Sequence, residues 1–382
     1  MDEQVPTLAA MLAGIPDPRG ARGRRHPWSA LLLEIVAGLL SGAQSQRAVA
    51  RWGRDVGLRR RRQLGFTRRR APSLATVHRV LHRVDVSALE ACVGRWLQQV
   101  RAAWLTSTVR WLDGIAVDGK TLRGARRLGA EDAYLLSACG QRDGLVLGEV
   151  AVPDATNELG VVATLLDRLP LAGETITFDA LFTQWAVAEQ VLAAGGAYLM
   201  AVKGNQPTLL ADCLAATADR PRRPRRLLGR ARSVELAHGR REERALLAVE
   251  APIDFPWPAA RQLLRLHRRR VDKRTSRLLA DETVYAVTSL SPEQASPSDL
   301  LRLWRRHWSI ENSLHWIRDV VFGEDDATTH TDHAPQAFAV FRNLAISLLH
   351  RWRGRDITAS RQFFAARPAA LFRRLGLSTR RL

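Results

Sequence analysis

Short apolar runs alternate with helical and turn segments between about residue 108 and residue 207, and this alternation limits the fold more than any other feature of the chain. Strands are expected at residues 109–117, 134–139, 145–152, 175–178 and 197–202, with a hairpin turn at 141–144. Helices are expected at 157–169, with Asn157 as a possible cap, and at 183–194. Three strands followed by alternating helix and strand predict a mixed α/β sheet.

The first hundred residues have a helical pattern instead. An apolar run follows Pro27 and extends to Leu40, and a shorter segment covers 46–52. Ser73 is a plausible N-cap of an amphipathic helix whose Arg79, His82 and Arg83 lie largely off the apolar face. Two interpretations stay open. The helices dock on DNA as a helix-turn-helix does, or they form a small helical domain whose arginines are merely solvated.

The C-terminal half begins with a break at Pro221–Pro224 and continues as a strand-rich stretch from about 233 to 290. Candidate strands are 245–249, 262–266 and 283–289. Pro297-Ser298 is expected to cap a long helix whose apolar residues recur at roughly helical spacing. A last helix over about 336–352 precedes a basic tail.

The charge of the chain points to an anionic partner. The 382 residues include 58 Lys and Arg against 38 Asp and Glu, so the net charge is +20. Distributed positive charge is typical of proteins that bind nucleic acid. The three cysteines form no CxxC pair, which argues against a disulfide framework or zinc ribbon and fits a reducing cytoplasm. No signal peptide or membrane span is expected.

Three acids are placed where they can share a cleft. Asp118 and Asp179 each follow an expected strand, and Glu311 lies on the long helix. Singly, each has an ordinary explanation as a turn former, a helix cap or a solvated side chain. Together they supply the hard oxygen ligands that two Mg²⁺ or Mn²⁺ ions, about 4 Å apart, need for phosphodiester cleavage. Asp118 is expected to bridge both ions. Residues expected to steady phosphates are Lys120, Arg123, Lys203 and Asn205.

The sequence around these acids carries a family resemblance. The blocks, in order, are Val117-Asp118-Gly119-Lys120-Thr121-Leu122-Arg123-Gly124, Phe178-Asp179-Ala180-Leu181, Val202-Lys203-Gly204-Asn205-Gln206, His238-Gly239-Arg240-Arg241-Glu242-Glu243-Arg244 and Arg306-His307-Trp308-Ser309-Ile310-Glu311-Asn312-Ser313-Leu314-His315-Trp316. They follow Ile15-Pro16-Asp17-Pro18-Arg19 near the start of the chain. The chain resembles bacterial insertion-sequence transposases of the DDE type, in the group that includes the H-repeat-associated proteins.

The resemblance implies an RNase H-like core, interrupted by a β-rich insertion before the third acid. The spacing agrees, because 61 residues separate the first two acids and 132 separate the last two. The expected division is a basic, DNA-binding helical domain at 1–105 and a catalytic domain at 106–382, with the insertion at about 220–292. The resemblance also implies that Trp304, His307 and Arg318 touch transposon-end DNA. Phe182 replaces a family His, and His307 replaces a family Arg.

The resulting hypothesis is a DNA transposase that cuts and joins transposon ends in the bacterial cytoplasm. Its expected partners are double-stranded DNA, both terminal inverted repeats and target, and a second copy of the chain on that DNA. One alternative is a catalytically silent DNA-binding protein derived from such an element. Another is an RNase H-like nuclease with a cellular role. His330 and His333 lack the spacing of a zinc site, and residues 119–124 lack that of a P-loop.

Overall fold

The computed structural model describes residues 5–21, 24–104, 111–130, 133–219, 226–237, 239–354 and 356–377. Contacts along the chain divide it into two units. Unit 1 takes residues 1–106, 119–169 and 310–382, and unit 2 takes 107–118 and 170–309. The expected strand residues 109–110, the break at 221–224 and the basic tail at 380–381 lie outside the described residues. Among the described helices, none has the length and apolar character needed to cross a membrane.

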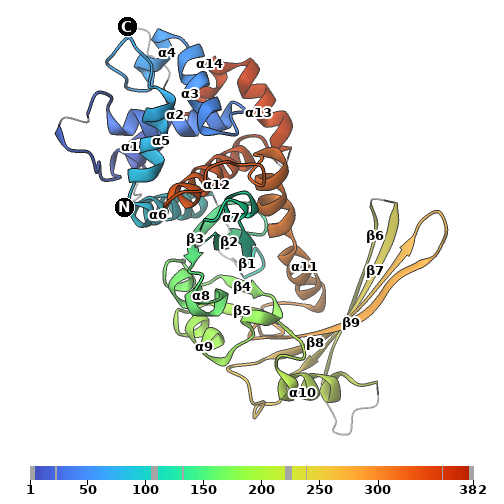
Figure 1. Cartoon of the computed structure of the whole chain (residues 1–382). Helices are drawn as coiled ribbons and strands as arrows, with labels where there is room; N and C mark the ends of the chain where they lie inside the picture. The colour runs from blue at the N-terminus through green and yellow to red at the C-terminus, as the bar shows by residue number, and fades with distance from the viewer. Residues whose placement is uncertain are drawn as a thin grey trace. The chain divides into compact units, whose positions relative to one another are not determined.

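Helices form the N-terminal part of unit 1, as the amphipathic pattern predicts. Ser45 and Ser73 accept hydrogen bonds from backbone N–H groups in the first turns of their helices, so both act as N-caps. In the helix that Ser73 caps, Val77, Val80 and Leu81 are buried, whereas Leu74 is exposed. The helices are α1 (Leu8–Ala13), α2 (Trp28–Leu40), α3 (Gln46–Asp55), α4 (Leu58–Gln63), α5 (Leu74–Arg83) and α6 (Val86–Trp104). Their arrangement is visible in Figure 1.

The rest of unit 1 combines a β-hairpin with helices from the chain's end. Strands β2 (Tyr134–Gly140) and β3 (Val146–Val152) pair antiparallel, which confirms the predicted hairpin. Helix α8 (Glu158–Asp167), capped by Asn157 as predicted, packs on this hairpin. The nearly fully buried α12 (Ala334–Arg353) packs against α2 and α6. Two helices absent from the sequence prediction follow it, α13 (Ile357–Ala366) and α14 (Pro368–Arg374).

Unit 2 is built on parallel strands. The first half of β1 (Ile115–Thr121) pairs with β4 (Thr175–Phe178), and β4 pairs with β5 (Ala197–Val202). Both β4 and β5 have the predicted bounds. The β1 prediction was wrong, because the described strand begins at Ile115 and continues past Asp118. Helix α9 (Trp185–Ala193) precedes β5, and α10 (Pro207–Thr217), which was not predicted, follows it.

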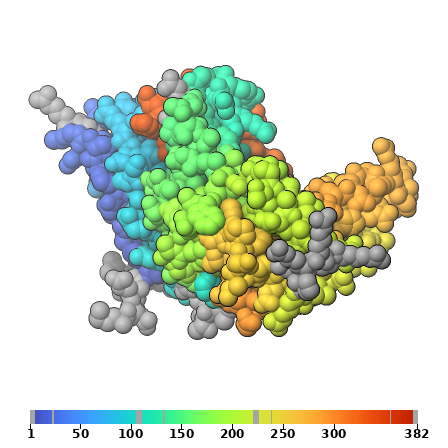
Figure 2. All heavy atoms as spheres, turned by 90° about the horizontal axis from the view of Figure 1, so that it is seen from below, coloured from blue at the N-terminus to red at the C-terminus, as the bar shows by residue number. Residues whose placement is uncertain are grey.

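The inserted strands extend the same sheet. Four 11-residue strands follow α10: β6 (Leu227–Ala237), β7 (Arg240–Glu250), β8 (Gln262–Asp272) and β9 (Leu278–Thr288). Strand β9 pairs antiparallel with β5, so the insertion is continuous with the parallel strands. The far end of these strands projects from the rest of unit 2, and the part of it formed by β8 and β9 is orange in Figure 2. The full strand order is β3-β2-β1-β4-β5-β9-β8-β7-β6.

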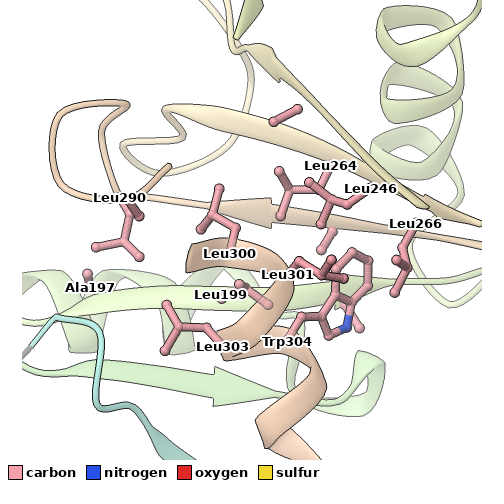
Figure 3. Packing of buried hydrophobic residues seen from close by; sticks show 14 of the residues in the cluster. Ala197, Leu199, Leu246, Leu264, Leu266, Leu290, Leu300, Leu301, Leu303 and Trp304 are labelled. Carbon is pink, nitrogen blue, oxygen red and sulfur yellow. The ribbon is translucent and has the colours of Figure 1, made fainter. Parts of the chain in front are cut away.

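The core of unit 2 lies between this sheet and α11 (Pro297–His307). Ser296 caps the helix, one residue before the predicted position, and forms a capping box with Asp299. Leu300, Leu301 and Trp304 of the helix pack on side chains of β5, β7 and β8 (Figure 3). The described chain is therefore an α/β protein with a mixed sheet flanked by helices and an N-terminal helical region, which confirms the predicted fold class.

Candidate active site

The first two predicted acids occupy matching positions on neighbouring parallel strands of unit 2. Val117 of β1 pairs with Phe178 of β4, so the residues that follow, Asp118 and Asp179, lie side by side. Neighbouring strands are about 4.8 Å apart, and paired residues point to the same face of a sheet. The two carboxylates therefore leave the sheet together. Asp118 does so from within its strand, and Asp179 directly after the end of β4.

Asp179 is held as an ionised carboxylate. Its Oδ1 accepts a hydrogen bond from the Ala180 N–H at 2.7 Å and one from Lys203 Nζ at 3.1 Å. Burial acts to raise the pKa of Asp179, but these two hydrogen bonds and the Lys203 charge outweigh it and lower the pKa below its usual value. Half of the Asp179 side chain remains exposed. Its oxygens are thus charged and accessible.

The turn after β5 fastens the loop that follows Asp179. The Asn205 side chain donates to the Ala180 carbonyl at 2.7 Å, and the Gln206 side chain donates to the Thr183 carbonyl at 2.8 Å. Asn205, expected to contact phosphate, therefore positions the loop that carries Asp179. Gln206 was not among the predicted site residues, although it belongs to the same sequence block as Lys203 and Asn205, which were predicted.

His307, the last residue of α11, reaches the same face of the sheet. Its Nδ1 lies 2.9 Å from the hydroxyl of Thr177, which is two residues before Asp179 and therefore on the same face. Burial lowers the pKa of His307 to about 4, against the opposing effect of the Asp179 charge. The imidazole is neutral at physiological pH and supplies no positive charge to a phosphate.

Trp304 does not agree with the predicted stacking on DNA. Only 9% of its surface is exposed, and Figure 3 shows its ring among Leu264, Leu266 and Leu301. The reason is helical spacing. Because α11 buries Leu300 and Leu301 against the sheet, position 304 faces the same core. The prediction was wrong, and Trp304 is a core residue.

Glu311 belongs to unit 1 and begins a π-helical segment, Glu311–His315, which a second one, Ile317–Val321, follows. The predicted long α-helix is thus α-helical only in its first part. Such segments are rare and are often found at functional sites. Glu311 Oε2 lies 3.1 Å from Nδ1 of His315, which is buried. This hydrogen bond, then the charges of His315, Lys120 and Arg123, lowers the pKa of Glu311, whose side chain is 53% exposed. His315 was also missed as a site residue.

Lys120 is also buried in unit 1, which contradicts its predicted contact with phosphate. Its Nζ donates to Asp319 Oδ1 at 2.5 Å, and 6% of the side chain is exposed. Lys120 therefore ties the end of β1 to the π-helical segment. Arg123 is different, because 72% of its side chain is exposed and Asp325 lies 3.7 Å away. Arg123 can still reach a phosphate.

The close packing around Gly124 explains why the Asp118–Gly124 block ends in a glycine. A Cβ at this position would lie 2.6 Å from the carbonyl oxygen of Glu324 and 2.8 Å from that of Asp325. Only a residue without a side chain allows this close approach of two backbone segments. The block therefore packs directly on the loop that follows the π-helical segments.

Arg318 was predicted to touch DNA, and its burial contradicts this. The side chain is 0% exposed and donates to Glu149 Oε2 and Glu324 Oε2, both at 2.8 Å. Arg342 donates to the other oxygen of Glu324 at 2.9 Å. A buried guanidinium needs such anionic partners, and here they accept from its Nε and Nη1. Arg318 is a structural residue beneath the π-helical segments.

Phe182, which stands where the family commonly has a histidine, lies in an apolar environment. The side chain is 2% exposed, and its ring lies 5.9 Å from that of Phe178. An apolar residue fits this site, where a charged histidine would need a partner. The replacement leaves the carboxylates of Asp118 and Asp179 unaffected.

Comparisons with known proteins agree with these features. Residues 112–348 match the family described as the transposase DDE domain, and residues 9–97 match the domain described as associated with it. YbfL and the H repeat-associated protein YhhI, both of Escherichia coli K12, are each 30% identical to this chain, and the match covers 88% of both sequences. YncI of Escherichia coli O157:H7, named as a transposase, is 27% identical over 90% of this chain and 87% of its own. The chain therefore belongs to the bacterial DDE transposases of the H-repeat family.

Proposed function

We propose that this protein is an active DNA transposase that cleaves and joins DNA strands at a site made of Asp118, Asp179 and Glu311. The main support is the pairing of β1 with β4, which brings two carboxylates to one face of the sheet. Helix α11 covers this face and leads, four residues after His307, to Glu311. Four residues of helix advance about 6 Å.

The three side chains fit divalent metal ions. They offer only hard carboxylate oxygens, which suit Mg²⁺ or Mn²⁺, and the Asp179 and Glu311 side chains are half-exposed. Two such ions, when bound, stabilise the attacking and the leaving oxygen of a phosphodiester. Asp118 would hold both ions, with Asp179 and Glu311 completing one each.

The neighbouring residues prepare the carboxylates for this role. The ammonium of Lys203 keeps Asp179 ionised, and Asn205 and Gln206 fix the loop behind it. In unit 1, His315 orients Glu311 by a hydrogen bond. The side chains of Arg123 and Lys203 are paired with Asp325 and Asp179 but remain mostly exposed, so each can also approach a phosphate, which favours binding of the DNA backbone.

The substrate we propose is double-stranded DNA, first the terminal inverted repeats of the element and then the target. Two ends must be joined to one target, so we propose that two copies of the chain assemble on the DNA. We further propose that the helical residues 1–105 bind DNA and that residues 106–382 carry out the chemistry. The reaction would take place in the bacterial cytoplasm, where the DNA is.

Substitution of the acids tests this function. Asp118→Asn, Asp179→Asn and Glu311→Gln keep side-chain size but remove the charge a metal needs. Each is expected to reduce Mg²⁺-dependent cleavage of a duplex carrying the element's end by about a thousandfold or more, as loss of a central catalytic group does. Binding of that duplex should remain.

The matched control is Glu189→Gln, since Glu189 is an exposed acid on α9. It should cleave like the wild type. Undiminished cleavage in any of the three variants would remove that residue from the site. Binding without cleavage by the wild-type protein would favour the alternative of a silent DNA-binding protein.

A further inference from the structure

A cavity of about 610 Å³ lies among the N-terminal helices of unit 1. Three separate segments contribute to it: the chain before α2, the loop between α4 and α5, and α5 itself. Each segment brings two arginines. The cavity, here called the basic cavity, is lined by Arg19, Arg25, Arg68, Arg70, Arg79 and Arg83.

Acidic side chains do not balance this charge. The described lining includes no Asp or Glu. Arg19 is paired with Asp17 at 2.8 Å, but within the described part of the chain the other five arginines have no ion pair. The concentration of charge is felt locally, since burial and then the charges of Arg68, Arg19 and Arg25 lower the pKa of His26. Like charges gathered at one site favour an anionic ligand.

The segments around the cavity are held in place. The guanidinium of Arg61 donates to the carbonyl of Arg69 at 2.8 Å, which anchors the loop between Arg68 and Arg70. In the segment before α2, the His26 ring packs edge-on against Phe66, with 5.5 Å between centroids. The backbone segments that carry these arginines are therefore held in place before a ligand binds, which lowers the entropy lost on binding.

Helix α5 adds further hydrogen-bond donors to the cavity and sets the direction along which they are arranged. Ser73 and Thr76, in its first turn, line the cavity, so the positive end of the helix dipole faces the same space. Arg79 and Arg83 are four residues apart and project from one side of the helix. The cavity thus offers hydrogen-bond donors along a line, rather than around one point.

The chemistry of the lining identifies the partner. It has no Trp, Tyr or Phe on which an unpaired base could stack, and no described carboxylate to bind a sugar hydroxyl. What remains is chiefly guanidinium and hydroxyl, groups that contact phosphate oxygens of the backbone. We propose that the basic cavity binds consecutive phosphates of one strand of duplex DNA. This inference rests on the proposed function, because the DNA would be that of the transposon end.

The test measures how DNA binding by the full-length protein depends on salt. Each phosphate contact contributes about 0.9 to the slope of log K against log salt concentration. The double variants Arg68→Gln/Arg70→Gln and Arg79→Gln/Arg83→Gln should each lower the magnitude of the slope by about 1.8. The loss should be equal on an unrelated duplex, because phosphate contacts carry no sequence information.

The control is Arg59→Gln/Arg62→Gln, which removes the same charge from exposed positions of α4 outside the cavity. It should leave the slope nearly unchanged. Arg68→Lys/Arg70→Lys, which keeps the charge, should retain most of the slope. An unchanged slope in both cavity variants, or an equal loss in the control, would overturn the proposal.

Cleavage separates this proposal from the catalytic one. At saturating protein concentration the cavity variants should still cut DNA, while Asp118→Asn should not cut but should keep the wild-type slope. A cavity variant with a normal slope and normal cleavage would refute only the cavity.

Discussion

Two groups of arginines in unit 1 differ in their partners. Arg318 and Arg342 are almost fully buried, and both are paired with carboxylates, Arg318 with Glu149 and Glu324 and Arg342 with Glu324. The arginines of the basic cavity line an open space, and five of the six have no ion pair within the described chain. A high arginine content therefore has two meanings in this protein. Paired and buried arginines hold the fold, whereas unpaired arginines around a cavity favour an anion.

The difference follows from solvation. A buried charge loses its hydration and is tolerated only when an opposite charge and hydrogen bonds replace the water. An arginine at an accessible cavity keeps part of its hydration and can exchange it for phosphate oxygens. Substitutions in the buried group should therefore change the free energy of unfolding. Substitutions in the basic cavity should instead change DNA binding.

The largest effect is expected when the buried group loses its shared acid. Glu324→Gln leaves Arg342 without an anionic hydrogen-bond partner among the described residues and leaves Arg318 with Glu149 alone. We expect the free energy of unfolding to fall by about 3–5 kcal/mol. Urea denaturation measures it, with Asp326→Asn, an exposed acid of the same loop, as control. A loss below about 1 kcal/mol in Glu324→Gln would mean that the pairing does not hold the fold.

The next effect depends on pH and comes from a buried acid that forms no ion pair with any described arginine. Glu34 of α2 is 0% exposed, and neither of its carboxylate oxygens has a hydrogen-bond partner within the described chain. Burial raises the pKa of Glu34 to about 8, although the charge of Arg61 opposes this. The folded state keeps a proton that the unfolded state releases, so stability should fall as pH rises from about 4.5 to 8, by about 1.4 kcal/mol per unit.

Glu34→Gln should remove this pH dependence and stabilise the protein increasingly between pH 5 and pH 8. The measurement is the free energy of unfolding at several pH values, beside Asp55→Asn, which removes an exposed acid of α3. If the wild type and Glu34→Gln have parallel pH profiles, Glu34 is not protonated in the folded state.

The smallest effect on stability is expected at the basic cavity. Without DNA, Arg70→Gln and Arg83→Gln should each change the free energy of unfolding by less than about 0.5 kcal/mol, because no ion pair is lost. At low salt a slight gain is expected, since a like charge is removed. Thermal denaturation of the wild type and of both variants at two salt concentrations measures this change in stability. A loss above about 1 kcal/mol would place these arginines with Arg318 as structural residues.

Patterns of short range predicted much of the fold. The caps Ser73 and Asn157, the hairpin and the strands β4 and β5 were all anticipated, because capping and alternation are properties of a few neighbouring residues. Of the inserted strands, β7, β8 and β9 were predicted too short, and β6 was not predicted. The far halves of β7 and β8 carry charges on both faces, and these charges are matched by partners on other strands, such as Arg268 with Glu282 and Arg244 with Glu235, which no local pattern reveals.

The sequence by itself determined the family and the mixed α/β class, because these depend on residue types in a fixed order; on the same basis it predicts the three acids. Only the tertiary structure decided what the basic and aromatic residues around the acids do. Lys120, Trp304 and Arg318 are buried, while Arg123 stays exposed. Burial depends on segments distant in the chain, such as Asp319 against Lys120 and Glu149 against Arg318, and so it cannot be inferred from the neighbours of a residue.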